Sequence, residues 1–209
     1  MSCIEGWQAL LGLVFPPSCV TCGRIVEATP YRTLCAGCAA ELEFTLPPAA
    51  VRFRGPARDL ILALKYRGAR FVLRDIETIF AQSAALLDHV RGAALIPVPL
   101  HPRRRRERGF NQSELIARCL ARAAGGQTTI VCALQRVIDT APSASLGRQG
   151  RPANVKNAFA LRRLPGLNRS SRYLLVDDVV TTGSTLESCA HVLRAGGAMN
   201  VDVATFGRG

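Results

Sequence analysis

The sequence is poor in lysine, histidine and aromatic residues. Only two of its 27 basic residues are lysines, Lys65 and Lys156, and neither stands in a G-x-x-x-x-G-K-[ST] loop. That absence excludes an ATPase of the Walker type. The three histidines form no recognisable Ser-His-Asp or Cys-His arrangement. Aromatic residues make up 6% of the chain, too few for an extended surface on which nucleic-acid bases stack.

Long apolar runs are also missing, so we expect no membrane insertion. The short run from Trp7 to Phe15 lacks the features of a signal peptide, because no basic residue occurs before Arg24 and Pro16-Pro17 fits poorly with a small-residue cleavage site. The sequence therefore predicts a short helix there that packs on the rest of the protein. It also predicts a cytoplasmic location, and with it reduced cysteines.

What is present fits one α/β domain of ordinary size with a small appendage. The 209 residues are 48% hydrophobic, which is enough for a real core. The net charge of +12 and the pI near 10.2 favour anionic partners: phosphates, nucleic acid, or both. The excess of arginine over lysine, together with abundant alanine, is typical of a GC-rich genome. Part of the net positive charge therefore has a mutational origin, which weakens it as evidence for DNA binding.

Four cysteines form two C-x2-C pairs separated by twelve residues, Cys19 and Cys22 followed by Cys35 and Cys38. Each pair can hold one side of a tetrahedral ion, so the spacing predicts a structural zinc site with no catalytic role. The alternatives are two disulfides, which are disfavoured in the cytosol, and a redox pair, which would not need a second copy. Residues 47–50, Pro-Pro-Ala-Ala, resemble a linker. We therefore expect a helix and zinc ribbon over 1–46 and a second domain over 47–209.

The second domain alternates helical and strand patterns, which predicts an α/β fold with an open, mostly parallel sheet flanked by helices. A helix begins after Asn111, which is an N-cap, with Glu114 placed to complete a capping box. Residues 135–157 are expected to form a long loop. The other expected helices are 57–65, 72–90 and 185–195, and the expected strands are 93–100, 128–134, 158–161, 173–176 and 200–206.

The most informative segment follows the apolar residues 174–176, where Asp177 and Asp178 are expected to end a buried strand. Ligands in open α/β folds bind beyond such strand ends, and the helix that follows offers N–H groups suited to a phosphate. A ribose 5-phosphate fits both, with its diol on the two acids. The 5-phosphate would then lie in a hydroxyl-rich turn made of Thr181, Thr182, Gly183, Ser184 and Thr185. The alternatives are a Walker B segment and an ordinary helix start capped by Thr182 or Ser184.

A run of arginines follows the expected strand 93–100 and should lie at the same end of the sheet as the acids. Guanidinium groups bind phosphate oxygens in pairs, so this loop could stabilise a pyrophosphate leaving group. A solvated basic turn or a non-specific nucleic-acid patch is the alternative. The predicted pyrophosphate loop consists of Arg103, Arg104, Arg106, Arg108 and Gly109.

The run from the apolar strand through D-D-V-V-T-T-G-S-T resembles the phosphoribosyl-pyrophosphate (PRPP) loop of type I phosphoribosyltransferases. The cysteine knuckle, K-Y-R-G at 65–68, P-V-P-L-H-P-x-R-x-R-x-R-G-F-N-Q and the acid loop follow one another as in the ComF/GntX family. This resemblance spans residues 19–206. It implies a type I phosphoribosyltransferase fold with a zinc ribbon, bacterial origin and a link to natural competence for DNA uptake.

Carried over from the resemblance, Asp177 and Asp178 are the catalytic pair that holds the ribose diol, and residues 181–185 hold the 5-phosphate. The loop 103–110 holds the pyrophosphate, and Mg²⁺ accompanies PRPP. Two functions remain open. The chain is either an active transferase on an unidentified acceptor, or a PRPP- or nucleotide-binding adaptor that contacts single-stranded DNA and competence proteins. Oligomeric state is not encoded in any recognisable motif.

Overall fold

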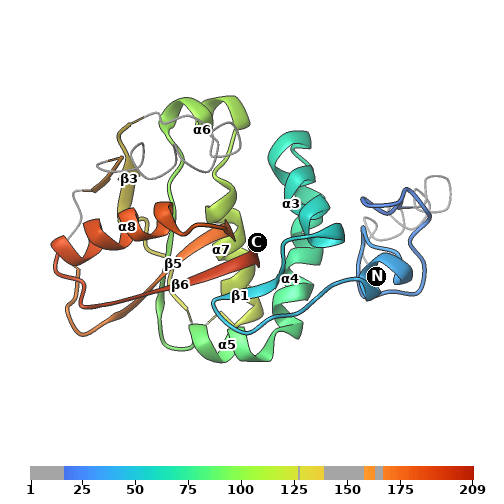
Figure 1. Ribbon diagram of the computed structural model, residues 1–209, viewed down its shortest axis with the longest axis horizontal. Coiled ribbons are helices and arrows are strands. Elements are labelled where there is room, and N and C mark those ends of the chain that lie inside the picture. The colour runs from blue at the N-terminus through green and yellow to red at the C-terminus, as the bar shows by residue number, and fades with distance from the viewer. Residues whose placement is uncertain (1–16, 127, 139–157, 163–166) are drawn as a thin grey trace, which may run out of the picture.

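The computed structural model describes residues 17–126, 128–138, 158–162 and 167–209, and its centre is a four-stranded parallel sheet (Figure 1). The strand order is β1-β6-β5-β2, and every neighbouring pair is parallel. The strands are β1 (Ala49–Arg52), β2 (Ala94–Pro97), β5 (Arg172–Val180) and β6 (Asn200–Arg208). The expected open parallel sheet is therefore confirmed.

Helices cover both faces of this sheet, so apolar side chains of a strand can be buried on either face. Strand β5 shows the division, because Leu174 and Val176 join the core under α3, α4 and α7, while Tyr173 and Leu175 join the core under α8. A separate antiparallel pair, β3 (Leu134–Arg136) with β4 (Phe159–Leu161), lies beyond β2. The helices are α2 (Ala36–Ala40), α3 (Gly55–Arg67), α4 (Leu73–Gln82), α5 (Ala84–Val90), α6 (Pro102–Arg108), α7 (Gln112–Ala123) and α8 (Ser184–Ala195), with a 3₁₀ turn η1 (Arg70–Val72).

Several expected elements have different limits. The single helix over 72–90 is interrupted at Ser83, whose backbone leaves the helical region and whose hydroxyl donates to the carbonyl oxygen of Ile79 at 3.0 Å. Strand 93–100 shortens to β2 because prolines at 97 and 99 cannot donate to a ladder. The strand expected over 128–134 reduces to a parallel bridge between Ile130 and Leu95.

The linker expected over residues 47–50 was wrong, because its last two residues begin strand β1. Ala49 and Ala50 are fully buried, and the backbone N–H of Thr205 in β6 donates to the carbonyl oxygen of Pro48 at 2.7 Å. These short side chains allow β1 to pack closely at the edge of the sheet. The chain therefore enters the parallel sheet immediately after Pro48, and the division at 46/47 stays a prediction.

Two expectations fall outside the described residues: the short helix over 7–15 and residues 139–157 of the long loop. Within the part of the chain that the structure describes, no helix combines the length and the apolar character needed to cross a bilayer.

Candidate functional site

Asp177 and Asp178 lie inside strand β5 rather than at its end, because β5 continues to Val180. Asp177 pairs with Thr205 of β6, and β5 continues four residues beyond the expected limit at Val176. Since β2 ends at Pro97, opposite Val176, the acids nevertheless project past the end of the neighbouring strand.

Asp178 forms an ion pair with Lys65, which comes from the last turn of helix α3. The side chains are 6% and 22% exposed respectively, so the pair is partly shielded from water. The K-Y-R-G motif at 65–68, whose role the sequence left unexplained, thus supplies the cation that faces the acid pair. Gly68 ends α3 in the left-handed conformation, with φ 60°, which glycine adopts without strain.

Asp177 is held by helix α7. The hydroxyl of Ser113 donates to Asp177 Oδ1 at 2.7 Å, and the backbone N–H of Asp178 donates to the same oxygen at 2.9 Å. Ser113 itself is fixed by Asn111, the confirmed N-cap of α7, whose Oδ1 accepts from the Ser113 N–H at 3.2 Å. Glu114 does not complete the expected capping box; it pairs with arginines 118 and 105 instead.

These surroundings change the acidity of Asp177. Burial, followed by the negative charge of Asp178, raises the pKa of Asp177 to about 7. The Ser113 hydrogen bond and the positive charge of Lys65 act in the opposite direction, because both favour the ionised carboxylate. The charge on Asp177 therefore responds to pH near neutrality.

The hydroxyl-rich turn links β5 to α8 and reaches the surface. Gly183, at φ 75°, is the N-cap of α8 and provides no side-chain acceptor, which argues against the alternative of an ordinary helix start capped by Thr182 or Ser184. Those two hydroxyls lie 3.2 Å from each other instead. A twelve-residue helix therefore begins without a side-chain cap on its first N–H groups, an arrangement that suits an external anion.

The arginine run is helical rather than a loop. Helix α6 starts at Pro102, with the ring of His101 accepting from the backbone N–H of Arg103, and it ends before Gly109. Proline at the first helical position and arginine in the interior both favour a helix, which explains the difference. None of its residues is buried. The guanidinium of Arg108 donates to Gln112 at 2.5 Å and lies 6.0 Å from the ring centroid of Tyr66.

The end of α3, the consecutive helices α6 and α7, and strand β5 therefore meet near the carboxyl ends of β2 and β5. The end of α3 contacts Asp178 through Lys65 and α6 through Tyr66, while α7 contacts Asp177 through Ser113. The structure thus links the predicted acid pair to Arg108 through α3. Lys65 and Ser113 were missed, and only the unexplained lysine in an otherwise lysine-free stretch signalled one of them.

The four cysteines converge, with their Sγ atoms all within 4.8 Å of one another. Zn–S bonds of about 2.3 Å in a tetrahedron separate sulfurs by roughly 3.8 Å, so the donor set fits zinc. All four are free of disulfide bonds, contrary to the disulfide alternative. Burial raises the pKa of the Cys19 thiol, but backbone hydrogen bonds from Cys35, Cys22 and Thr21 outweigh it and lower the pKa to about 6. A thiol that ionises this readily is suited to a metal ligand.

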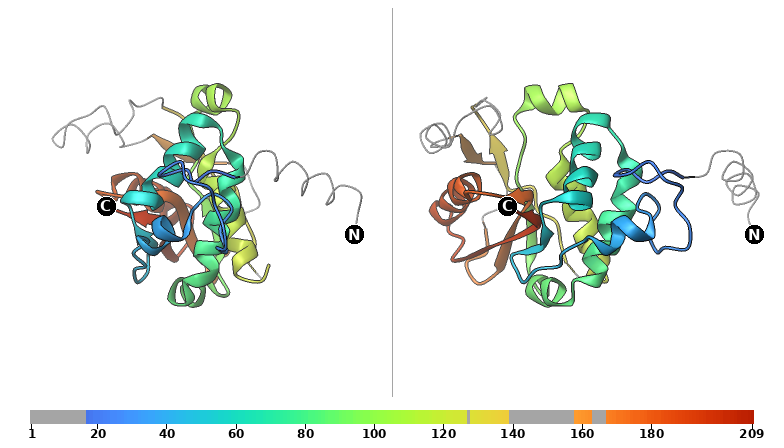
Figure 2. Two further views of the ribbon diagram at one scale, coloured as in Figure 1. Left: turned by 90° about the vertical axis from the view of Figure 1, so that its right-hand side faces the viewer. Right: turned by 45° about the vertical axis from the view of Figure 1, so that its right-hand side comes forward.

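The ribbon is fixed to the body by Asp75, a fully buried carboxylate in the first turn of α4. It accepts from the backbone N–H groups of Arg32 and Thr33, each at 2.7 Å, and from the Thr33 hydroxyl at 2.6 Å. The hydroxyl of Tyr31 donates to Gln82 at the other end of α4. Figure 2 shows the ribbon beside α3 and α4. No sequence pattern indicated this contact, apart from an acid next to an apolar stripe.

Comparison with known proteins gives one family match near the N-terminus and several similar relatives. The family described as double zinc ribbon domain matches residues 10–53. DNA utilization protein YhgH of Salmonella typhimurium is 42% identical over 158 residues, 71% of this chain and 65% of that protein. Competence protein F of Haemophilus influenzae is 38% identical over 112 residues, 53% and 48% of the two chains. Competence protein ComFC of Bacillus subtilis is 26% identical over 141 residues, 65% and 52%.

The chain spans about half to two thirds of the length of these curated relatives. Among solved structures, a hypoxanthine phosphoribosyltransferase from Staphylococcus aureus matches with a TM-score of 0.39 at 16% identity, covering 64% of this chain and 62% of the other. A purine phosphoribosyltransferase from Pyrococcus horikoshii matches with a TM-score of 0.36 at 21% identity, covering 62% and 72%.

Proposed function

Because the chain belongs to the ComF family of proteins with an N-terminal zinc ribbon, we propose that it binds PRPP with Mg²⁺ on a type I phosphoribosyltransferase-like body. One observation supports this most directly. The acid pair on β5 is held from one side by Lys65 and from the other by Ser113, beside the uncapped N-terminus of α8. Structural zinc in the ribbon and a cytoplasmic location complete the proposal.

In this proposal, each part of PRPP meets a different part of the chain. The ribose diol donates to Asp177 and Asp178, and the 5-phosphate accepts from the N–H groups and hydroxyls of residues 181–185. The arginines of the predicted pyrophosphate loop, which do not include Arg105, approach the pyrophosphate. Oxygen donors such as the two carboxylates fit Mg²⁺, which when bound neutralises charge on the phosphates.

Lys65 has two roles in the proposed cycle. In the free protein its ammonium group offsets the repulsion between the two carboxylates, which lets both stay close on one strand. When the ribose hydroxyls arrive, they compete with Lys65 for Asp178, so the lysine must share or release its partner. It is thus a positioning residue, because it acts through the carboxylate and not on the reacting atoms.

If the protein transfers the phosphoribosyl group, catalysis relies on placement and electrostatics. Departure of pyrophosphate leaves an oxocarbenium-like centre at C1, which a nitrogen nucleophile of the acceptor attacks. The guanidinium groups of α6 stabilise the charge that develops on the leaving group. The acid pair fixes the sugar so that the acceptor and the leaving group lie on opposite sides of C1.

Calorimetry with PRPP and Mg²⁺ tests the shared donor site. The double substitution Asp177→Asn and Asp178→Asn should weaken binding by at least about tenfold, because it removes charged acceptors. Asp88→Asn, an exposed acid of α5, is the matched control and should bind as the parent does. Equal affinity in the double variant would remove the proposal. If the double variant binds more weakly, release of pyrophosphate with a panel of bases decides whether transfer occurs.

A second candidate function is an adaptor that binds PRPP and single-stranded DNA, with transfer weak or absent. It is favoured by two exposed aromatic rings, Tyr66 at 70% and Phe71 at 65%. Three exposed arginines, Arg67, Arg70 and Arg74, lie in the same nine residues. Stacking rings among cations are typical of surfaces that bind single strands. The low content of aromatic residues therefore excludes an extended base-stacking surface but not a short one.

Fluorescence anisotropy with a labelled oligonucleotide tests the adaptor. The double substitution Tyr66→Ala and Phe71→Ala should weaken binding by about tenfold or more, since stacking contributes about 1–3 kcal/mol per base. Leu46→Ala plus Met199→Ala removes exposed apolar area elsewhere and should have no effect. Salt should weaken binding of the parent protein. DNA binding that ignores both the rings and the salt would contradict the adaptor.

A further inference from the structure

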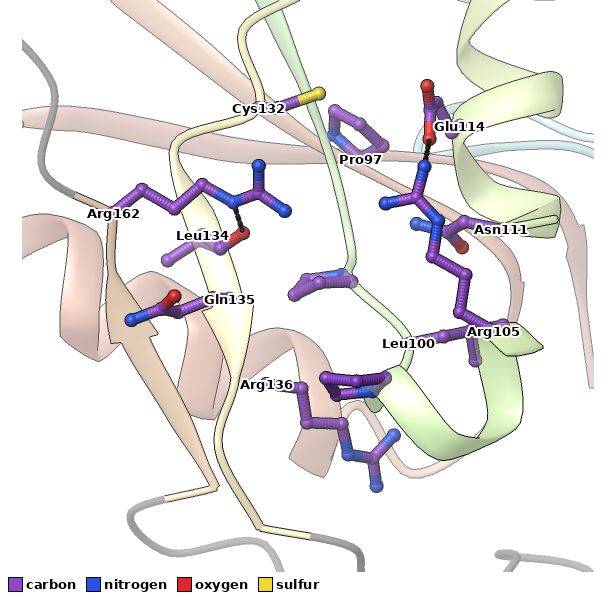
Figure 3. A pocket seen from close by; sticks show the side chains of 12 residues that line it. Pro97, Leu100, Arg105, Asn111, Glu114, Cys132, Leu134, Gln135, Arg136 and Arg162 are labelled. Carbon is purple, nitrogen blue, oxygen red and sulfur yellow. Dashed lines mark hydrogen bonds and ion pairs between the residues drawn. The ribbon is translucent and has the colours of Figure 1, made fainter.

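A pocket of about 210 Å³ opens beside strand β2 and has neither of the two acids in its lining. Its walls come from the segment after β2, from α6 and α7, and from the β3–β4 pair (Figure 3). Strand β2 has β5 on one side, and on the other it bonds to residues 129–131, which lead into this wall. Among the described residues that line the pocket, none comes from β5, α3 or the hydroxyl-rich turn.

Positive charge dominates this pocket. Guanidinium groups from three elements line it, namely Arg105 of α6, Arg136 of β3 and Arg162 at the end of β4. Among the described residues that line the pocket, the carboxylate is that of Glu114 in α7. It forms ion pairs with Arg105 at 3.7 Å and with Arg118 at 3.1 Å. An incoming anion therefore meets more cationic than anionic groups.

Arg162 is fixed in a position to receive such an anion. Its backbone N–H donates to the carbonyl oxygen of Ala133 at 2.8 Å, and its Nε donates to the carbonyl oxygen of Leu134 at 3.1 Å. The rest of its guanidinium points into the pocket, as Figure 3 shows. A fork that is already held in place loses little freedom when it binds an oxyanion, which favours affinity.

The size of the pocket limits the ligand. Pockets that hold drug-sized molecules are about 300–1,000 Å³, and this one is smaller. We propose that the pocket is a second anion site, separate from the predicted PRPP site, which holds one phosphate group between Arg162 and Arg105. The phosphate is either inorganic or the head group of a small phosphomonoester. The site does not depend on PRPP binding or on transferase activity.

Cys132 provides a local reporter, because its exposed thiol lines the same pocket. It is also the single cysteine of the tryptic peptide 123–136, so its alkylation can be followed by mass spectrometry in the zinc-loaded full chain. Inorganic phosphate should slow alkylation of Cys132 by iodoacetamide several-fold and saturably. Sodium chloride at the same ionic strength should not. Glycerol phosphate in place of phosphate shows whether a phosphomonoester enters as well.

Two variants test the assigned contacts. Arg162→Ala should raise the phosphate concentration for half protection by about tenfold, because each lost charge-assisted contact contributes about 1.5 kcal/mol or more. Arg105→Ala, on a different element, should act in the same direction and guards against local distortion of β4. Arg169→Ala removes an exposed arginine from another surface and should leave protection unchanged.

The outcomes separate this site from the predicted PRPP site. Loss of phosphate protection in Arg162→Ala, with PRPP affinity unchanged, supports the second site. Absence of protection in the parent protein, or equal protection by chloride, overturns it. Equal protection in the parent and in both pocket variants overturns it as well, because the phosphate would then act from elsewhere.

Discussion

The zinc ribbon and the acid pair are both clusters of groups that carry the same charge, and they resolve the repulsion differently. Four sulfur ligands converge in the ribbon, where the compensating charge is a metal ion supplied from outside. In the body, Asp177 and Asp178 are compensated by Lys65 from the chain itself. The first cluster is expected to need its cation in order to fold, whereas the second has a cation from the chain itself, which a ligand would displace in the proposed function.

This difference has a structural counterpart. The ribbon ligands lie within 20 residues of one another, so the module forms locally around its ion. The acid site combines α3, α7 and β5, which meet only when the sheet and its helices assemble. A closed metal site therefore suits a structural role, while a site built at the edge of a packed sheet suits binding. Four experiments test this difference between the zinc ribbon and the acid site.

The largest effect is expected from removing zinc. Structural zinc in small finger modules contributes about 10–16 kcal/mol of apparent binding energy, so a strong chelator or Cys35→Ser should unfold the ribbon. Metal analysis and thermal unfolding would follow the loss. Cys132→Ser, which removes an exposed thiol outside the cluster, is the control. Absence of zinc in a fully folded protein would contradict the comparison, because the thiolates would then need another source of charge balance.

The contact between the two regions comes next. Asp75→Ala should lower the free energy of unfolding by about 3 kcal/mol, since it leaves the backbone N–H groups of residues 32 and 33 without their acceptor. Asp88→Ala removes an exposed acid and should change stability little. Chemical denaturation measures both. Equal stability of the two variants would mean that the ribbon is not held by this carboxylate.

Removing the internal cation should have a smaller effect. Lys65→Met leaves the two carboxylates facing each other and should destabilise the fold by about 2 kcal/mol, less than a fully buried pair because Lys65 is 22% exposed. It should also move the pH midpoint of PRPP binding upward, whereas Lys65→Arg should keep both properties near those of the parent. An unchanged midpoint in Lys65→Met would show that the lysine does not control the acids.

The smallest effect is a pH dependence of the folded state. The pKa of Asp177 is raised in the folded protein to about 7, so its contribution to stability is present in acid and is lost as pH rises through about 7. Ligand binding should show the opposite trend, since the diol needs an ionised acceptor. Ser113→Ala should shift the midpoint upward, because it removes a bond to the carboxylate. Denaturation and calorimetry between pH 5 and 9 measure both trends, and Asp177→Asn should abolish them.

Sequence patterns predicted most elements of the body but misplaced several limits. Apolar continuity identified β5 and β6, and capping identified the start of α7 at Asn111. Propensity failed where tertiary contacts decided the outcome. Ala49 and Ala50 resembled a linker, yet they complete the sheet edge because small side chains allow close packing. The arginine run resembled a loop by charge, although its proline start and arginine interior both suit a helix.

The candidate metal ligands could be identified from the sequence alone, because four thiols within 20 residues can bind one ion independently of the rest of the fold. It also determined the order in which acids, hydroxyl groups and arginines follow buried strands. Three contacts became visible only in the tertiary structure. Lys65 forms an ion pair with Asp178, Ser113 donates to Asp177, and Asp75 accepts from the ribbon. These contacts join residues 40 or more positions apart, and no local period records them, since they arise when helices pack on a common sheet.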